Sequence, residues 1–264
     1  MLVTDRLFKQ FADHGIFDLV QDGALFVVNH SGGKDSQAQY ALISALVPAE
    51  QIVVVHADLG DVEWTGVKAH IAANTDHPTH IAQAIYKDGS EKNLLNYIEN
   101  RGMFPSSTAR FCTSDLKRGP CEKVIRRLSK ETGRQIIVSC FGFRAEESAA
   151  RAKRPVFSLN QRNSKAGRTW YDFNPIHHLT TAEVFAVIAS AGQEAHPAYA
   201  TGNERLSCVF CIFGSKNDLA HGAKERPELF RRYIELEKKI DHTFRHGQTI
   251  EQAAGITINQ LTGE

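Results

Sequence analysis

Residues 25–36 of this 264-residue chain read LFVVNHSGGKDS. The first four residues form a continuous apolar run, which predicts a buried strand. Beyond the two glycines, apolar residues recur at helical spacing along residues 38–46 and would form one stripe against a sheet. This unit therefore reads as a strand, a glycine turn and a helix.

Three further apolar runs resemble the first one. They occupy residues 52–55, roughly residues 79–85, and residues 136–138. Continuous apolar strands that alternate with helical stretches indicate a parallel sheet covered by helices on both faces. We therefore expect an α/β fold with a doubly wound parallel sheet.

The second half of the chain contains two clear helix signals. Thr180 and Glu183 form a capping box for a helix that Gly192 can end. Pro227 fits the first turn of a carboxyl-terminal helix, whose Phe230 and Tyr233 are expected in the core. Residues 196–215, between these helices, are expected to form a loop.

The overall composition is that of a large globular domain. Hydrophobic residues make up 42% of the sequence, and the amino-terminal residues contain no long apolar run. We therefore expect a cytoplasmic protein with no signal peptide and no membrane partner. In that reducing compartment the five cysteines are expected to serve metal binding or redox chemistry instead of disulfides.

The net charge of +1 conceals a basic segment. Residues 110–168 contain fifteen Lys or Arg and five acidic residues, so they carry +10 and the remainder of the chain carries −9. Such a segment indicates a polyanionic ligand, either a nucleotide or nucleic acid. The alternative is a set of solvated helix surfaces, since Arg126, Arg127 and Lys130 fall on one expected helix.

The turn at residues 31–36 has the features of a phosphate-binding loop. Gly32 and Gly33 allow the backbone amides to approach an anion at a helix amino terminus. Lys34 can neutralise phosphate charge on what we expect to be an exposed loop, and Asp35 can cap the helix or orient Lys34 and Mg²⁺. The hydroxyl groups of the flanking residues, Ser31 and Ser36, can donate hydrogen bonds. An ordinary strand-to-helix turn is the alternative, and the spacing matches neither common nucleotide-binding glycine motif.

Several other residues are candidates for chemistry. Arg144 and Asp58 follow expected strands at the edge where open α/β sheets bind ligands. The Arg144 guanidinium suits a phosphate or an adenylate, and the Asp58 carboxylate can hold Mg²⁺ or the ribose, or simply form a turn. Cys208 and Cys211 have the spacing of a metal clip, and Cys121 can join them or pack as a small apolar residue. Cys140 is expected in the core. His30 and the His177-His178 pair are candidate acid–base groups, although the sequence assigns them no carboxylate partner.

Five sequence motifs, in order along residues 25–215, resemble those of a known family, the PP-loop ATP pyrophosphatases, and in particular their branch related to phosphoadenosine phosphosulfate (PAPS) reductase. They are the Ser31-Gly32-Gly33-Lys34-Asp35-Ser36 loop, His56-Ala57-Asp58-Leu59-Gly60, Arg110-Phe111-Cys112-Thr113 with Lys117 and Pro120, Gly142-Phe143-Arg144 with Glu146, Glu147, Ser148 and Arg151 followed by Asn174-Pro175-Ile176, and Ser207-Cys208-Val209-Phe210-Cys211.

The resemblance implies a fold of the adenine nucleotide alpha hydrolase type, with a catalytic domain over residues 1–215 and a helical extension over residues 216–264. It implies ATP and Mg²⁺ as cofactors, with Lys34, Asp35 and Arg144 as catalytic residues. It also places Cys112 with Cys208, Cys211 and Cys121, which leaves three possibilities open: an iron–sulfur cluster, zinc, or free thiols of which one carries persulfide.

Two departures bear on the activity. Many reductases of this family alter the Gly-Gly-Lys loop and carry a cysteine in a carboxyl-terminal tail, whereas this chain keeps the loop and has no cysteine after Cys211. The pattern is closer to the relatives that insert sulfur into the DNA backbone with sulfur from a cysteine desulfurase. The expected function is ATP pyrophosphatase chemistry on a nucleic acid. A PAPS reductase and a non-catalytic ATP-sensing subunit are the alternatives.

Overall fold

The structure is a computed structural model that describes residues 3–263. Its strands are β1 (Leu25–Asn29), β2 (Ile52–Asp58), β3 (Thr79–Gln83), β4 (Ile136–Cys140), β5 (Phe157–Leu159) and β6 (Thr169–Phe173). They form a six-stranded sheet in the order β3-β2-β1-β4-β6-β5. The pairs β1–β2, β1–β4 and β4–β6 are parallel, and only the β5–β6 pairing is antiparallel among those described. The predicted α/β fold with a parallel sheet is confirmed.

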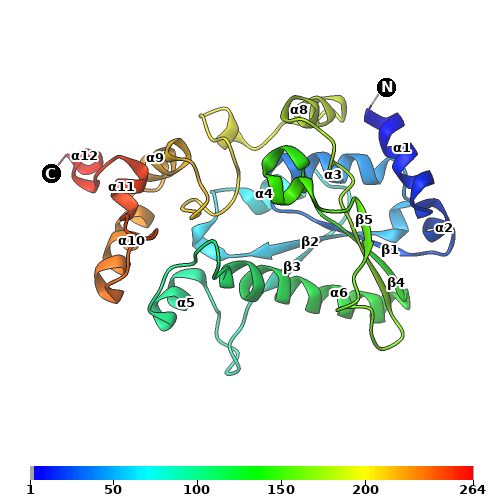
Figure 1. The fold of residues 1–264 in the computed structure, drawn as a ribbon, viewed down its shortest axis with the longest axis horizontal. Coiled ribbons are helices and arrows are strands. Elements are labelled where there is room, and N and C mark those ends of the chain that lie inside the picture. Colours follow the sequence, from blue (N-terminus) through cyan, green and yellow to red (C-terminus); the bar gives the residue numbers. More distant parts are fainter. Residues whose placement is uncertain (1–2, 264) are drawn as a thin grey trace. The chain divides into compact units, whose positions relative to one another are not determined.

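The helices fall between and after the strands. They are α1 (Val3–Asp13), α2 (Ile16–Gln21), α3 (Lys34–Ser44), α4 (Val67–Ala73), α5 (Leu94–Arg101), α6 (Gly119–Thr132), α7 (Ala149–Ala152), α8 (Thr181–Ser190), α9 (Lys216–Glu225), α10 (Pro227–Ile240), α11 (Ile250–Ala254) and α12 (Ile258–Thr262). In Figure 1, α3 and α8 cover one face of the sheet and α6 covers the other.

The chain divides into two compact units whose segments alternate along the sequence. Unit 1 consists of residues 1–56, 67–81 and 122–196, and unit 2 consists of residues 57–66, 82–121 and 197–264. Unit 1 contains most of the sheet, and unit 2 contains α5 and the helices from α9 onward. The boundary at residue 215 suggested by the sequence motifs stays a prediction.

The sheet order places a topological switch between β1 and β4. Chain progression from β1 runs outward through β2 to β3, and the chain then returns to the other side of β1 as β4. Such a switch leaves a crevice at the carboxyl ends of the two strands, which is where open α/β sheets bind ligands. The glycine turn after β1 and the segment after β4 both lie at this point.

The predicted strands coincide with β1 to β4, whereas β5 and β6 lack a clear sequence signal. Strand β6 mixes apolar with polar residues, and β5 is a three-residue edge strand that is partly exposed. Neither strand carries the continuous apolar run that marks a strand buried on both faces. They were therefore absent from the sequence-based prediction.

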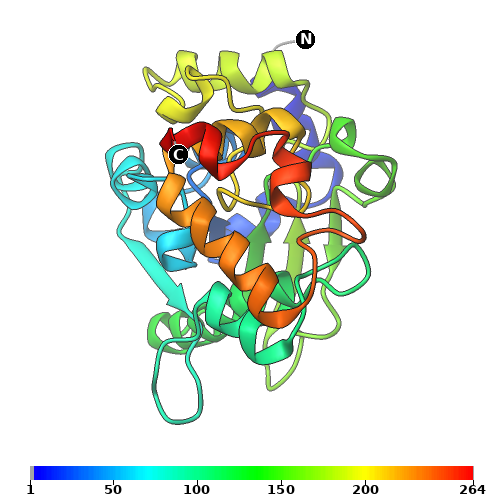
Figure 2. The same ribbon diagram turned by 90° about the vertical axis from the view of Figure 1, so that its left-hand side faces the viewer.

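Unit 2 has its own aromatic core. Tyr233 on α10 packs against Phe104, Phe210 and Phe244, with ring centroids 5.1–6.1 Å apart. Helix α10 also contacts α5, α9, α11 and α12, and Figure 2 shows α10 beside α11. The predicted capping box of α8 and the proline at the start of α10 are both present. No helix in residues 3–263 is long and apolar enough to cross a membrane.

Candidate functional site

The glycine turn in unit 1 is held by hydrogen bonds within the loop. Gly32 has φ +78°, a conformation that favours glycine, and a Cβ there would lie 2.9 Å from Val67 Cγ1. The Ser36 hydroxyl donates to Gly33 O at 2.8 Å and accepts from the Ser31 amide at 3.1 Å. Gly33 is the amino-terminal cap of α3 and provides no capping side chain. The first turn of α3 thus retains the amide donors that an anion needs.

His30 supports this loop as a neutral imidazole. Its Nδ1 accepts a hydrogen bond from the Gly32 amide at 3.0 Å, and its side chain is buried. Burial, together with His56 and His70, lowers the pKa of His30 to about 3. The ring is therefore uncharged at neutral pH and acts as an acceptor in the loop, which differs from the acid–base role considered from the sequence.

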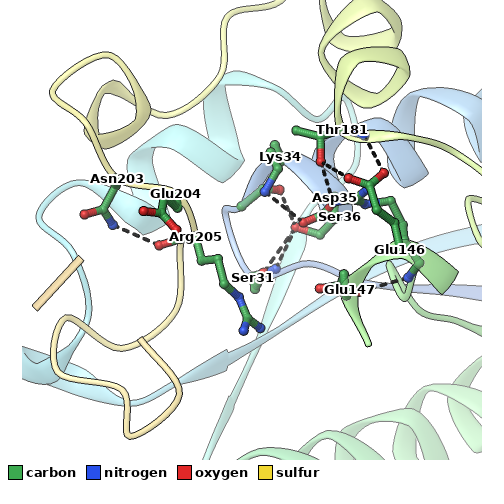
Figure 3. A network of polar contacts seen from close by, with 12 residues as sticks. Ser31, Lys34, Asp35, Ser36, Glu146, Glu147, Thr181, Asn203, Glu204 and Arg205 are labelled. Carbon is green, nitrogen blue, oxygen red and sulfur yellow. Dashed lines mark hydrogen bonds and ion pairs between the residues drawn. The ribbon is translucent and has the colours of Figure 1, made fainter. Parts of the chain in front are cut away.

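Lys34 and Asp35 lie next to each other at the start of α3 (Figure 3). Lys34 Nζ is 3.4 Å from one Asp35 oxygen, and Arg144 Nε donates to the other at 2.6 Å. The expectation of an exposed lysine was wrong, because Lys34 is only 4% exposed. Its burial strengthens the field that its charge exerts on a phosphate bound at the loop.

Arg144 is engaged entirely by the protein. Besides Asp35, its guanidinium donates to Glu146 at 3.1 Å, to Leu179 O at 3.2 Å and to Thr181 Oγ1 at 3.2 Å. The side chain is buried, and each of its three guanidinium nitrogens has a protein partner. This geometry favours a positioning role for Arg144, which fixes Asp35, over the direct phosphate contact expected from the sequence.

Glu146 and Thr181 extend the hydrogen-bond network of Arg144. The sequence did not predict that these two residues take part in it. The Glu146 carboxylate accepts from the Thr181 amide at 3.0 Å and from its hydroxyl at 2.9 Å (Figure 3). These bonds lower the pKa of Glu146 and connect the segment after β4 to the start of α8. The available sequence signals were the motif around Arg144, which includes Glu146, and the capping box at Thr180.

A close backbone approach joins the two sides of the switch point. A Cβ on Gly142 would lie 3.0 Å from the Asp35 carbonyl carbon and 3.2 Å from the Ser36 amide nitrogen. Glycine is therefore favoured where the segment after β4 crosses the first turn of α3, because any larger residue would press on this backbone. The Gly-x-Arg spacing follows from this arrangement, since the approach at Gly142 carries Arg144 to Asp35.

The His177-His178 pair supports the segment after β4. His177 is buried, its Nε2 lies 3.0 Å from Arg151 O, and its carbonyl accepts from the Ala145 amide at 2.8 Å. These contacts give His177 a structural function. His178 is exposed, and partial burial and the neighbouring His177 lower its pKa.

Asp58 ends β2, as expected, and makes a turn. Its Oδ1 accepts a hydrogen bond from the Gly60 amide at 2.9 Å, and Gly60 has φ +70°. A ligand role for Asp58 stays a prediction.

Unit 2 brings together three of the four cysteines proposed as metal ligands. Cys112 and Cys211 both raise the pKa of Cys208, and Cys211 raises that of Cys112, so the three groups interact electrostatically. Burial is the main cause of the Cys208 pKa of about 12. Among the described residues, no ligand set of three sulfur atoms lies within 4.8 Å of one another. Cys121 is buried on the first turn of α6 and Cys140 is buried in β4.

Two further groups face the three cysteines, which we call the cysteine cluster. The pKa of Lys117 is raised, with Cys208 as the largest cause. Tyr233 is buried with an unpartnered hydroxyl, and the charges of Cys208 and Cys211 add to the effect of burial in raising its pKa. A cation and a hydroxyl donor without a partner suit an anionic group at the thiols. Lys117 stands in the cysteine motif, whereas Tyr233 had no sequence signal beyond core packing.

The model of the phosphoadenosine phosphosulfate reductase domain matches residues 26–213. An uncharacterized 37.8 kDa protein from the gpa 5′ region of Escherichia phage 186 is 32% identical over 149 residues, which are 56% of this chain and 43% of that protein. The match thus spans less than half of the relative's length.

Two solved structures show a distant likeness. One is phosphoadenylyl-sulfate reductase from Candida auris, with a TM-score of 0.44, 15% identity, and coverage of 69% of this chain and 80% of that one. The other is FMN adenylyltransferase from Candida glabrata, with a TM-score of 0.43, 12% identity, and coverage of 71% and 55%.

Proposed function

The chain belongs to the phosphoadenosine phosphosulfate reductase domain family, and we propose that it is an ATP pyrophosphatase that activates an acceptor oxygen for sulfur insertion into nucleic acid. The observation that carries this proposal is the intact loop at residues 31–36, in which the buried Lys34 contacts an Asp35 fixed by Arg144. This arrangement suits the triphosphate of ATP.

The loop residues have separate tasks in this reaction. An acceptor oxygen attacks the α-phosphorus of ATP, the bond to the β-phosphate breaks, and pyrophosphate leaves. Lys34 and the amides at the start of α3 stabilise the charge that develops on the departing phosphates. Arg144 holds Asp35, which in turn orients Lys34, so that no reorganisation is needed as charge moves.

Mg²⁺ would accompany ATP and offset phosphate charge. This ion prefers oxygen ligands and usually keeps several waters while it binds substrate phosphates. Asp35 directs one oxygen to Arg144 and the other to Lys34, so it fits an orienting role better than direct metal ligation. Asp58 remains the proposed carboxylate for Mg²⁺ or the ribose.

Sulfur transfer requires a second step at the adenylated acceptor. A persulfide supplied by a cysteine desulfurase attacks the acceptor phosphorus and displaces AMP. A thiol then cleaves the resulting sulfur–sulfur bond, which leaves a phosphorothioate and a disulfide. Cys112, Cys208 and Cys211 offer the required thiols, and Lys117 stabilises an ionised one.

The alternative to free thiols at these cysteines is a metal site, and an anionic iron–sulfur cluster fits them better than a single zinc ion. Tetrahedral zinc with a bond of about 2.3 Å to each sulfur needs ligand sulfurs within about 4 Å of one another. The three cysteine sulfurs are spread more widely than that. A cluster held by Cys112, Cys208 and Cys211, with Cys121 as the proposed fourth ligand, would supply redox chemistry next to Lys117 and Tyr233.

A PAPS reductase is the second candidate, because the family model carries that description. The two functions differ in their products. Incubation with ATP, Mg²⁺, a nucleic acid and a persulfide donor is expected to give AMP and pyrophosphate, whereas PAPS with a reduced thioredoxin is expected to give no sulfite. Sulfite release would support the reductase, and tight ATP binding without products would support an ATP-sensing subunit.

A further inference from the structure

The segment after β4 carries an aromatic and cationic stack in unit 1. The rings of Phe141 and Phe143 are parallel, with centroids 5.5 Å apart and an interplanar angle of 5°. The guanidinium carbons of Arg151 and Arg154 each lie 4.7 Å from the centroid of Phe143. We call these four residues the stacking platform.

The platform is held rigidly by its neighbours. The Phe141 amide donates to Phe173 O at 2.8 Å, which continues the β4–β6 pairing for one residue. Arg151 forms an ion pair with Glu147, whose carboxylate also accepts from the Arg144 amide at 2.9 Å. The rings and one guanidinium are thus fixed before any ligand arrives, which lowers the entropic cost of binding.

The surface around the platform is basic. Residues 141–168 contain seven Lys or Arg and two acidic residues. Lys153 and Arg154 are exposed, and neither forms a salt bridge in the described part of the chain. Arg127 on α6 is exposed too, but it pairs with Glu131. Unpaired positive charge therefore lies beside the platform, as it also does at Lys123 and Lys130 on α6.

We propose that the stacking platform binds an unpaired base of single-stranded nucleic acid, while Lys153 and Arg154 contact its backbone phosphates. Aromatic rings next to arginine in a positively charged surface are the features that recognise single strands. Bases in a duplex are already stacked and paired, so their faces are not available to such rings. This inference rests on the proposed function, because it specifies the acceptor as single-stranded.

The position of the platform supports a role beside the phosphate loop. Phe141 and Phe143 flank Gly142, whose backbone closely approaches Asp35 and Ser36. A base on the platform would hold its neighbouring phosphate close to the loop. The adenine of ATP is a less suitable occupant, because the triphosphate of an ATP molecule bound at the loop would not lie along the exposed Lys153 and Arg154.

The test measures binding of a labelled thymidine oligonucleotide of about 12 nucleotides by fluorescence anisotropy, without ATP, at about 50 to 200 mM salt. Phe143→Leu keeps an apolar side chain, removes the aromatic face and is expected to weaken binding about tenfold. Arg154→Gln tests an exposed position and is expected to weaken binding and to flatten its salt dependence by about 0.7 in log–log slope. Arg127→Gln is the charge-matched control on α6 and is expected to bind as the wild type does.

Three results would overturn the inference. They are wild-type affinity in both platform variants, equal affinity of the wild type for a duplex of the same length, and a raised KM for ATP without a change in oligonucleotide affinity. The last would assign the platform to adenine. Pyrophosphate release without oligonucleotide binding would reject the platform but keep the proposed ATP cleavage. Oligonucleotide binding without pyrophosphate release would keep the platform but reject the proposed ATP cleavage.

Discussion

The phosphate loop and the cysteine cluster are built in opposite ways. The loop comes from six consecutive residues, and its polar groups are paired within unit 1, as the contacts of Ser36 and Asp35 show. The cysteine cluster combines residues from positions 112, 208 and 211, and its neighbours Lys117 and Tyr233 come from further segments. The buried Tyr233 hydroxyl has no hydrogen-bond partner. A loop that is complete by itself suits a soluble substrate, whereas the cluster has the character of a site completed by a bound group.

The cysteine cluster should lose the proposed iron–sulfur cluster entirely when one of its thiols is replaced. Protein purified without oxygen is expected to be brown and to contain iron and acid-labile sulfide, and Cys211→Ser is expected to contain neither, because a ligand has been removed. Iron analysis and the visible absorption spectrum measure this. Cys140→Ala is the control, since Cys140 lies in β4 and is expected to leave the iron content unchanged. Colourless wild-type protein with no iron would contradict the iron–sulfur cluster. The persulfide function would then be the remaining proposal for these cysteines.

The loop should lose most of its activity when its charge is removed. Lys34→Ala is expected to lower the rate of pyrophosphate release by about 10²- to 10³-fold, because one preorganised charge stabilising the transition state is lost. A coupled pyrophosphate assay measures the rate, and thermal unfolding checks that the fold persists. Lys130→Ala, on the exposed side of α6, provides the control. A rate within twofold of the wild type would remove Lys34 from the mechanism.

Arg144 provides an intermediate effect that distinguishes positioning from direct contact. Arg144→Gln is expected to reduce kcat by about 10- to 100-fold with a smaller change in the KM for ATP, because the misplaced Asp35 no longer orients Lys34. If Arg144 instead contacts phosphate directly, the KM should rise strongly. Combining it with Lys34→Ala should add little further loss, and full additivity would argue against a shared unit.

The smallest effect concerns stability at low pH. His30 has a folded pKa of about 3, below its ordinary value of 6.5, so the unfolded chain binds the additional proton between these pH values. Stability therefore falls as the pH drops below 6.5, by up to about 1.4 kcal/mol per pH unit from this residue. In His30→Asn the Asn oxygen can still accept from the Gly32 amide, and the decline in the free energy of unfolding from pH 6 to about pH 4 should be shallower. Urea unfolding measures it, and equal slopes in both proteins would contradict the buried neutral histidine.

The same contrast explains what could be predicted from the sequence. Strands β1 to β4 and the loop were found because their signals are local: a continuous apolar run and a glycine turn between a strand and a helix. Lys34 was placed on an exposed loop because burial of a lysine depends on segments distant in sequence. The involvement of Glu146 and Tyr233 likewise depends on contacts that no local pattern records, and β5 and β6 lack the apolar run of a central strand.

The central claim is that the loop cleaves ATP between its α and β phosphates. In reactions that contain nucleic acid and a persulfide donor, ATP labelled with ³²P at the α position, and in parallel at the γ position, distinguishes the possible products by chromatography. The account predicts labelled AMP in the first reaction and an equal amount of labelled pyrophosphate in the second, with both lost in Lys34→Ala. Labelled ADP with free phosphate, or no turnover of ATP with any nucleic-acid acceptor, would contradict it.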